Sequence, residues 1–379
     1  MKDKPTVLIA NGMMNAGGTE SLLMEMFRNS SGIVNYVLLI HYQDTIEKGL
    51  YDDEIEKSGI AIKYIPSIGT VGIKKYISEF KKVVDSIGNV DIVHSHINGN
   101  GGIISLAAQK AGIPVRICHC HADIHFTGTK LYRLKEELAL AILKGFIEIY
   151  ATERWACSSA AWRRLFFPWH KRVIIDNMIN PRKYLSNTAL KAKAKRKIRL
   201  PNKFIIGAVG RVAPIKNYEF VIRMLPHIPN ATFVCYGRFD EVNSYCKMLI
   251  DLAKSLGVSS RVQFMGNSNS VPEDIQSFDV FVMPSFSEGF GIAALEAQAA
   301  SLPVLVSMGI PHSIDVGLNL VKFLPTDDVT PWVVAINEIM ESQTPCIIDG
   351  RIIEAFAACG KDSVNGVNNI ENRYLSLCR

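Results

Sequence analysis

Short apolar segments alternate with stretches of helical periodicity along almost the whole 379-residue chain. Many of these segments are continuously apolar, which is typical of parallel strands covered on both faces. Strands that alternate with helices in this way predict doubly wound α/β sheets. We expect strands at nine segments: Val7–Ala10, Tyr36–Ile40, Ile60–Ile65, Asp91–His94, Val115–Cys120, Phe204–Val209, Ala231–Tyr236, Arg261–Met265 and Phe278–Met283.

The pattern restarts after residue 200, so a chain of this length is expected to form two domains. A hydrophobic content of 48% and a charged content of 21% suit a globular protein with sizeable cores. Asn180-Pro181 breaks the preceding strand and marks a boundary over residues 180–202. We predict a Rossmann-like domain over residues 1–180, to which a C-terminal helix over 362–379 can return, and a second over 200–361.

The segment PSFSEGFGIAALEAQAASLP, residues 284–303, carries two carboxylates eight positions apart, Glu288 and Glu296. A Gly-Phe-Gly turn, Gly289 to Gly291 with Phe290 between, joins an expected strand to an expected helix. Such a turn lets a ligand approach the backbone, and the helix N-terminus offers free N–H groups to an anion. We therefore predict a phosphate at the turn. Glu296, about two helical turns in, can reach a second part of the ligand, such as a ribose hydroxyl pair.

Two cations, Arg211 and Lys216, lie in GAVGRVAPIKN, just beyond another expected strand. Ligands of open α/β sheets bind at the carboxyl ends of the strands, so this pair could neutralise a diphosphate. Solvated loop charges are the alternative interpretation.

Two further glycine loops follow expected strands. Gly17-Gly18 precedes a helix that carries Glu20, although it matches neither the dinucleotide fingerprint nor the P-loop. A nucleobase could bind at the segment VQFMGNSNSV, which contains Gly266, Asn267 and Val271.

Four histidines gather at two strand ends, His94 and His96 in DIVHSH and His119 and His121 in RICHCHAD. A zinc site formed by the consecutive residues 118–121 is disfavoured, because successive strand side chains point to opposite faces. We expect hydrogen-bonded structural imidazoles at His94 and His119, and a functional role facing a reacting sugar for His121.

Two basic segments leave two interpretations open. Residues 191–199, KAKAKRKIR, carry six positive charges and no acid, and residues 130–144 place Leu131, Leu134, Leu138 and Ile142 at helical spacing among basic residues. Each can be a helix packed on its own domain or a contact with a phospholipid surface. The net charge of +6 favours acidic small molecules and anionic membranes, and no aromatic and basic motif indicates nucleic acid.

Eight scattered cysteines without a CxxC pair predict reduced thiols, most of them in the core. No apolar run approaches the roughly 18 residues of a membrane span. The N-terminal sequence enters a strand almost at once and lacks the features of a signal peptide, so we expect a cytoplasmic protein, with peripheral contact at the inner face of the membrane as an option.

Over nearly its full length the chain resembles the retaining glycosyltransferases of family 4, which have the GT-B fold: two Rossmann-like domains facing a cleft. The E-x7-E signature of that family matches Glu288 and Glu296, its phosphate-binding pair matches Arg211 and Lys216, and its GG-x-E loop matches Gly17, Gly18 and Glu20. Its histidine after the fifth strand fits His121. The segments DIVHSH, RICHCH and YATERWACSSAA resemble the branch that builds bacterial exopolysaccharide, capsule or O-antigen repeats.

The resemblance implies a nucleotide-sugar donor, often a UDP sugar, a saccharide acceptor that is commonly linked to polyprenyl diphosphate, and transfer without a metal ion. It implies that Glu296 binds the ribose and that Glu288 holds the donor sugar. His121 would position that sugar, Arg211 and Lys216 would stabilise the departing diphosphate, and Glu20 and His96 would contact the acceptor. No carboxylate nucleophile is evident for a double displacement, so same-face attack is the implied route.

One residue departs from the family pattern, because Met178 stands where a turn glycine is usual. If the family's glycine adopts a positive φ, Met178 is strained in the same conformation, unless the turn differs.

Two alternatives to transfer remain: a nucleotide-sugar epimerase of the same fold, and a non-catalytic nucleotide-sugar-binding subunit.

Overall fold

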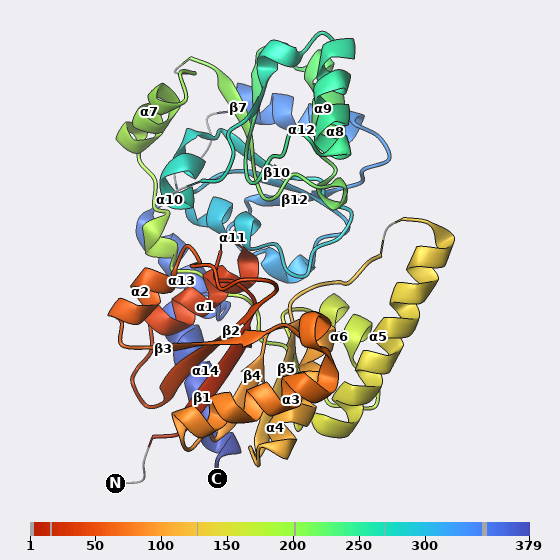
Figure 1. The fold of residues 1–379 in the computed structure, drawn as a ribbon. Coiled ribbons are helices and arrows are strands. Elements are labelled where there is room, and N and C mark those ends of the chain that lie inside the picture. Colours follow the sequence, from red (N-terminus) through yellow and green to blue (C-terminus); the bar gives the residue numbers. More distant parts are fainter. Residues whose placement is uncertain (1–3, 16, 127, 201, 269, 343–346) are drawn as a thin grey trace. The chain divides into compact units, whose positions relative to one another are not determined.

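The computed structural model describes residues 4–15, 17–126, 128–200, 202–268, 270–342 and 347–379 (Figure 1). The chain divides into two compact units. The first unit joins residues 1–178 to residues 363–379, and the second comprises residues 179–362. Each unit is built around its own parallel sheet.

The sheet of the first unit has the strand order β3-β2-β1-β4-β5-β6, and all neighbouring strands are parallel. Its central strand, β1, is buried from Val7 to Asn11 because helices cover both faces. The described strands are β1 (Thr6–Asn11), β2 (Asn35–Tyr42), β3 (Ala61–Pro66), β4 (Ile92–Ser95), β5 (Val115–Cys120) and β6 (Glu153–Ala156). The helices are α1 (Gly18–Arg28), α2 (Asp52–Lys57), α3 (Ile68–Ile87), α4 (Gly101–Lys110), α5 (Lys130–Tyr150), α6 (Ser159–Leu165) and α14 (Ser363–Leu377), with a 3₁₀ turn at η1 (Asn98–Asn100).

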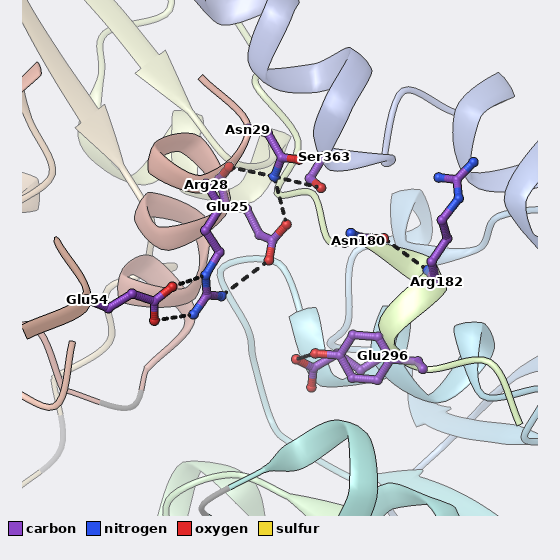
Figure 2. A network of polar contacts seen from close by, with 9 residues as sticks. Glu25, Arg28, Asn29, Glu54, Asn180, Arg182, Glu296 and Ser363 are labelled. Carbon is purple, nitrogen blue, oxygen red and sulfur yellow. Dashed lines mark hydrogen bonds and ion pairs between the residues drawn. The ribbon is translucent and has the colours of Figure 1, made fainter. Parts of the chain in front are cut away.

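The C-terminal helix, α14, belongs to the first unit and completes its core. Tyr374 is fully buried among the side chains of that core, and Glu371 is fully buried as well. The Glu371 carboxylate accepts hydrogen bonds from Ser30 Oγ at 2.7 Å and from the Ser31 amide at 3.0 Å. Asn29 donates to Ser363 Oγ at 3.3 Å, which ties the end of α1 to the start of α14 (Figure 2).

The sheet of the second unit has the order β12-β11-β10-β7-β8-β9, again with parallel neighbours. Its strands are β7 (Phe204–Val209), β8 (Ala231–Tyr236), β9 (Val262–Phe264), β10 (Val280–Met283), β11 (Val304–Ser307) and β12 (Val321–Leu324). Its α-helices are α7 (Thr188–Lys197), α8 (Tyr218–Met224), α9 (Ser244–Ser255), α10 (Val271–Asp274), α11 (Ile292–Ala299), α12 (Thr330–Glu341) and α13 (Asp349–Ala358). Short 3₁₀ turns are η2 (Pro181–Lys183), η3 (Pro214–Lys216), η4 (Leu225–His227), η5 (Ser259–Arg261), η6 (Ile275–Ser277) and η7 (His312–Ile314).

The predicted α/β class with two doubly wound parallel sheets is confirmed. All nine expected strands are present; three have the expected bounds, and the ends of the other six differ by at most two residues. The strands β6, β11 and β12 were not expected; each has four residues, and β6 and β12 contain charged ones. Such short segments carry too little periodicity to stand out from the neighbouring helices and loops.

The backbone at Met178 differs from the turn that the family's glycine would form. Met178 is absent from the positive-φ residues of the described chain and is buried in the first core, so the turn differs from the glycine-containing one and the residue is not strained there. The described cysteines form no disulfide. Cys359 and Cys378 are exposed, whereas the other described cysteines are buried. Cys346 lies outside the described residues. In the described part of the chain, no helix is long and apolar enough to cross a membrane.

His41, at the end of β2, connects the sheet to α3. Its Nδ1 lies 2.9 Å from the Asn11 carbonyl and therefore carries the proton, while its Nε2 lies 2.7 Å from the Tyr76 hydroxyl. Burial lowers the pKa of His41 to about 4. In the unfolded chain the ring titrates near 6.5, so acid favours the unfolded state.

We predict that this histidine makes the first unit less stable as the pH falls below about 6.5, with the loss levelling off near pH 4. The wild type is compared with His41→Asn by urea unfolding at pH 7.5 and pH 5. The stability advantage of the wild type should shrink by about 1–2 kcal/mol at pH 5, since each unit of pKa shift is worth about 1.4 kcal/mol. An advantage that is the same at both pH values would contradict this assignment; the exposed His227→Asn serves as the control.

Candidate functional site

The strand order of the second sheet creates one edge at which ligands of such sheets bind. The chain proceeds outward from β7 through β8 to β9, then returns to the other side of β7 as β10. The direction of winding therefore reverses between β7 and β10, and the loops after these two strands flank the reversal point. Crevices at such points are the usual ligand sites of open α/β sheets.

The loops after β7, β8 and β9 pack closely through glycines. Gly237 has no room for a side chain, since a Cβ would lie 2.0 Å from the Gly210 carbonyl oxygen. The Gly237 amide donates to the Gly266 carbonyl at 2.7 Å, and the Gly210 amide donates to the Tyr236 carbonyl at 2.8 Å. Sequence reasoning identified Gly266 but missed Gly237, because its partner loop is 27 residues distant in the chain.

Lys216 and Glu288 meet at the reversal point. Lys216 ends η3 after β7, Glu288 lies in the loop after β10, and the Lys216 ammonium donates to Glu288 Oε1 at 2.5 Å. Ser285 Oγ donates to the same oxygen at 2.7 Å, which leaves Oε2 as an acceptor for a ligand hydroxyl. Arg211 lies in the same loop as Lys216 and is exposed. The two predicted cations thus share one loop, and only Lys216 is held by the Glu288 carboxylate.

The glycine turn leads directly into α11. Gly291 adopts φ 103° and ψ 48° at the N-cap, a conformation that favours glycine, and the Phe290 side chain is buried. The first N–H groups of a helix have no partner within it, so this end of α11 presents donors and a partial positive charge. The turn is thus suited to an anion, as the sequence predicted.

Glu296 lies just over one turn into α11, and the expectation of two turns was wrong because the helix begins at Ile292. Its side chain is buried, and it accepts a hydrogen bond from the Tyr184 hydroxyl at 2.7 Å (Figure 2). Tyr184 follows η2, where Asn180 Oδ1 accepts from the Arg182 amide. The sequence did not reveal this tyrosine, since 112 residues separate it from Glu296.

The remaining residues of the predicted base-binding loop lie beyond β9. Gly266 has φ 73°, Asn267 is exposed, and Val271 begins α10. Ser268 donates to Asp274 at 2.7 Å and thereby closes the loop over the start of α10.

The first sheet has a reversal point of its own, between β1 and β4. Gly17 caps α1 in extended backbone, and Gly18 is the first helical residue. A Cβ at Gly17 would lie 2.2 Å from Glu20 Oε2, so glycine lets the Glu20 carboxylate fold back against the loop. Asn11 donates to Glu20 at 3.3 Å, and burial raises the pKa of Glu20.

The four histidines form one cluster beside this reversal point. His94 of β4 pairs with Ile117 of β5, and this register places His96 opposite His119 on the same face of the sheet. His96 Nδ1 lies 2.8 Å from His121 Nε2, and Asn98 accepts from the His121 amide at 2.9 Å. Burial lowers the pKa of His121 to about 3, so the ring is neutral.

Within each unit the structure brings the predicted residues together. Arg211, Lys216, Glu288, the 289–291 turn and Glu296 share one edge of the second sheet, whereas Gly17, Gly18, Glu20, His96 and His121 share one edge of the first. Ser285 and Tyr184 are additions that the sequence analysis did not name. The arrangement of the second unit suits a ligand with a diphosphate and hydroxyl groups.

The comparisons with known proteins agree with this arrangement. The family model of the glycosyl transferases group 1 matches residues 191–348. The chain is 31% identical over 373 residues to a Bacillus subtilis protein named as the glycosyltransferase EpsF, covering 95% of this chain and 94% of that one. It is also 26% identical over 314 residues to the capsular polysaccharide biosynthesis glycosyltransferase CapH of Staphylococcus aureus, covering 80% and 81%.

Solved structures show the same fold. Anabaena HepE in complex with UDP-glucose aligns with a TM-score of 0.76 at 18% identity, covering 98% of this chain and 99% of that one. WaaG, a glycosyltransferase involved in lipopolysaccharide biosynthesis, aligns with a TM-score of 0.67 at 15% identity, covering 97% and 99%. The fold is therefore the GT-B fold of glycosyltransferases. The chain belongs to the glycosyl transferases group 1 family and is a glycosyltransferase.

The stability of the second unit should depend on the glycine at position 291. Replacing Gly291 with Ala should reduce stability by about 1–2 kcal/mol, because an L-residue is strained in the left-handed region. Gly350→Ala is the matched control, since a Cβ there, in the first turn of α13, meets nothing within 4 Å. Urea unfolding of the full chain measures both variants. Equal stability of the two would show that the turn does not need its glycine.

Proposed function

We propose that this glycosyltransferase moves a sugar from a UDP-sugar donor to a lipid-linked saccharide during surface polysaccharide synthesis. The observation that carries the proposal is the Lys216–Glu288 pair at the reversal point of the second sheet, beside the N-terminus of α11. One Escherichia coli relative, 25% identical over 300 residues, is named UDP-Gal:alpha-D-GlcNAc-diphosphoundecaprenol alpha-1,3-galactosyltransferase. That name supports both the donor nucleotide and the diphosphate-linked acceptor.

The donor would lie along the loops of the second unit. The diphosphate would face the amides of residues 289–291 and the side chains of Arg211 and Lys216. Glu296, fixed by Tyr184, would accept from the ribose hydroxyls, and the base would rest on the loop of Gly266, Asn267 and Val271. Glu288 would accept from a donor-sugar hydroxyl through Oε2.

The chemical step would depend on charge that grows on the diphosphate as the glycosidic bond breaks. Cations and helix N–H groups that are already in place stabilise this charge without reorganising, and such stabilisation often contributes more to catalysis than any other effect. We propose that Lys216, Arg211 and the α11 terminus supply this stabilisation and that transfer needs no metal ion. Glu288 holds the Lys216 ammonium in position before the donor arrives.

We further propose transfer with retention, as in glycosyltransferase family 4. The acceptor hydroxyl would attack the face that the diphosphate leaves, and a phosphate oxygen would take its proton. His121 would position the donor sugar, while Gly17, Gly18, Glu20 and His96 would line the ligand-binding edge of the first sheet. The neutral state of His121 suits hydrogen bonding to a sugar hydroxyl.

Transfer can be tested with purified full-length protein. A panel of nucleotide sugars is first ranked by thermal stabilisation, and the best donor is then incubated with a prenyl-diphosphate-linked saccharide. Lys216→Ala should lower kcat by about 10²–10³-fold, the typical effect of removing one transition-state donor. Lys254→Ala, on the exposed surface of α9, should leave kcat unchanged.

Two outcomes would overturn the proposal. Conversion of the donor alone to an epimer would identify an epimerase. Tight donor binding without release of nucleotide diphosphate, under every acceptor, would identify a non-catalytic binding subunit.

The exposed residues of α5 support the proposal that transfer takes place at a membrane surface. Its apolar stripe is turned outward, with Leu131, Leu134, Leu138 and Ile142 between 58% and 78% exposed. Ile149 continues the stripe at 70% exposure, while Leu140 and Ile147 on the opposite side are buried. Lys130, Arg133 and Lys135 surround its first turns. A lipid-linked acceptor is presented at a bilayer, and a stripe of this kind with basic flanks suits an anionic bilayer surface.

The second basic segment, by contrast, packs on its own unit. Lys195 of α7 pairs with Asp279 at 2.6 Å, and Lys197 pairs with Asp274 at 2.8 Å. We therefore assign the membrane contact to α5.

Co-sedimentation with vesicles tests this assignment. Wild-type protein should bind vesicles containing phosphatidylglycerol, and the double variant Leu134→Glu, Leu138→Glu should lose at least tenfold in binding, because two charges would enter the apolar interface. Val242→Glu is the matched control, at a side chain 79% exposed in the second unit. Unchanged binding of the double variant would contradict the role of α5.

A further inference from the structure

Three rings of the histidine cluster in the first unit offer nitrogen atoms that all lie within 4.8 Å of one another. His94, His96 and His119 are all buried, and the Nε2 atoms of His96 and His119 have no hydrogen-bond partner. An unpartnered polar atom in a buried position is unfavourable for the folded state. The rings of His94 and His119 also pack edge-on against Trp155.

The hydrogen bonds within the cluster are compatible with a set of tautomers that leaves two ring nitrogens with free lone pairs. His94 Nδ1 lies 2.6 Å from the Tyr374 hydroxyl, and His94 Nε2 lies 3.0 Å from His119 Nδ1. When His119 Nδ1 donates to His94, His119 Nε2 is left with a lone pair. When His96 Nδ1 donates to His121 at 2.8 Å, His96 Nε2 is left with a lone pair as well. In that set of tautomers, the Nε2 atoms of His96 and His119 are buried lone pairs without a hydrogen-bond partner.

This is the pattern in which metal-binding histidines are found. A ligating imidazole usually donates its other ring N–H to a neighbour, which fixes the tautomer. One ring nitrogen from each of His94, His96 and His119 lies within 4.8 Å of the others. Zinc–imidazole bonds of 2.0–2.1 Å require these atoms to approach somewhat closer, which a modest rotation of the rings achieves. His94 would exchange its contact with His119 for the metal.

We propose that His94, His96 and His119 form a binding site for a divalent transition-metal ion of the zinc class. Imidazole nitrogens suit zinc, copper, nickel and iron, whereas magnesium, calcium and manganese prefer oxygen ligands.

The alternation of side chains along one strand disfavours a zinc site only for the consecutive residues 118–121. The ligands proposed here come from two neighbouring strands on the same face, and the thiol of Cys118 lies near Gly101 instead of in the cluster. The protein would therefore supply only nitrogen donors, and a water oxygen would complete the four-coordinate site. The site would join β4 and β5 to α14 through the His94–Tyr374 contact, and thus reinforce the return of the C-terminal helix.

The test uses tag-free, full-length protein that has been stripped with a chelator and contains no sugar nucleotide. Titration with Zn²⁺ should show one tight equivalent and a rise in thermal stability, and Co²⁺ should give the visible absorption bands of a tetrahedral site. His96→Gln and His119→Gln should each weaken Zn²⁺ binding by at least tenfold. His125→Gln, at an exposed histidine outside the cluster, should bind as the wild type does.

X-ray absorption of the zinc-loaded wild type keeps the test decisive if a cluster variant fails to fold. The expected first shell contains nitrogen and oxygen only, with the scattering pattern of imidazole. Sulfur in the shell, an absence of tight binding by the wild type, or undiminished binding by both cluster variants would overturn the site. Because no donor is present, these results are independent of the transfer assay.

Discussion

The parallel pairing of strands in each sheet is the constraint on which this structure depends. Parallel strands end at the same edge, so residues that are far apart in the sequence are delivered to one line of loops. In the second unit, 72 residues separate Lys216 from Glu288, yet β7 and β10 are neighbours and the two side chains meet. The same rule brings His96 and His121 together in the first unit. The order of the strands thus determines which side chains come together at each edge.

Glycine controls how closely the loops at that edge approach. Gly237 allows the loop after β8 to contact the loop after β7, and Gly291 allows the chain to turn into α11. With these contacts made, Lys216 is restrained by Glu288 before any donor is bound. A site in which cations and helix N–H groups are already oriented needs little reorganisation when charge develops. This preorganisation is the physical basis of the proposed departure of a diphosphate at this edge.

Much of this arrangement could be predicted from the sequence, because local patterns determined it. Continuous apolar runs revealed the long strands, and SEGFGIAALE revealed the turn and its helix. Contacts between distant segments could not be predicted, as Tyr184 with Glu296 shows. The short strands β6, β11 and β12 were missed because a segment of four residues, which in β6 and β12 includes charged ones, fits many local structures. The outward orientation of α5 was also left open, since amphipathic spacing does not say which neighbour covers the apolar face.

The central claim is that a diphosphate binds at the reversal point of the second sheet, between the amides of residues 289–291 and the side chains of Arg211 and Lys216. A crystal structure of the protein with UDP tests it most directly. The account predicts phosphate oxygens within hydrogen-bond distance of those amides and of the Lys216 ammonium, with the ribose against Glu296. A diphosphate bound elsewhere, or both cations turned away from it into solvent, would contradict the account.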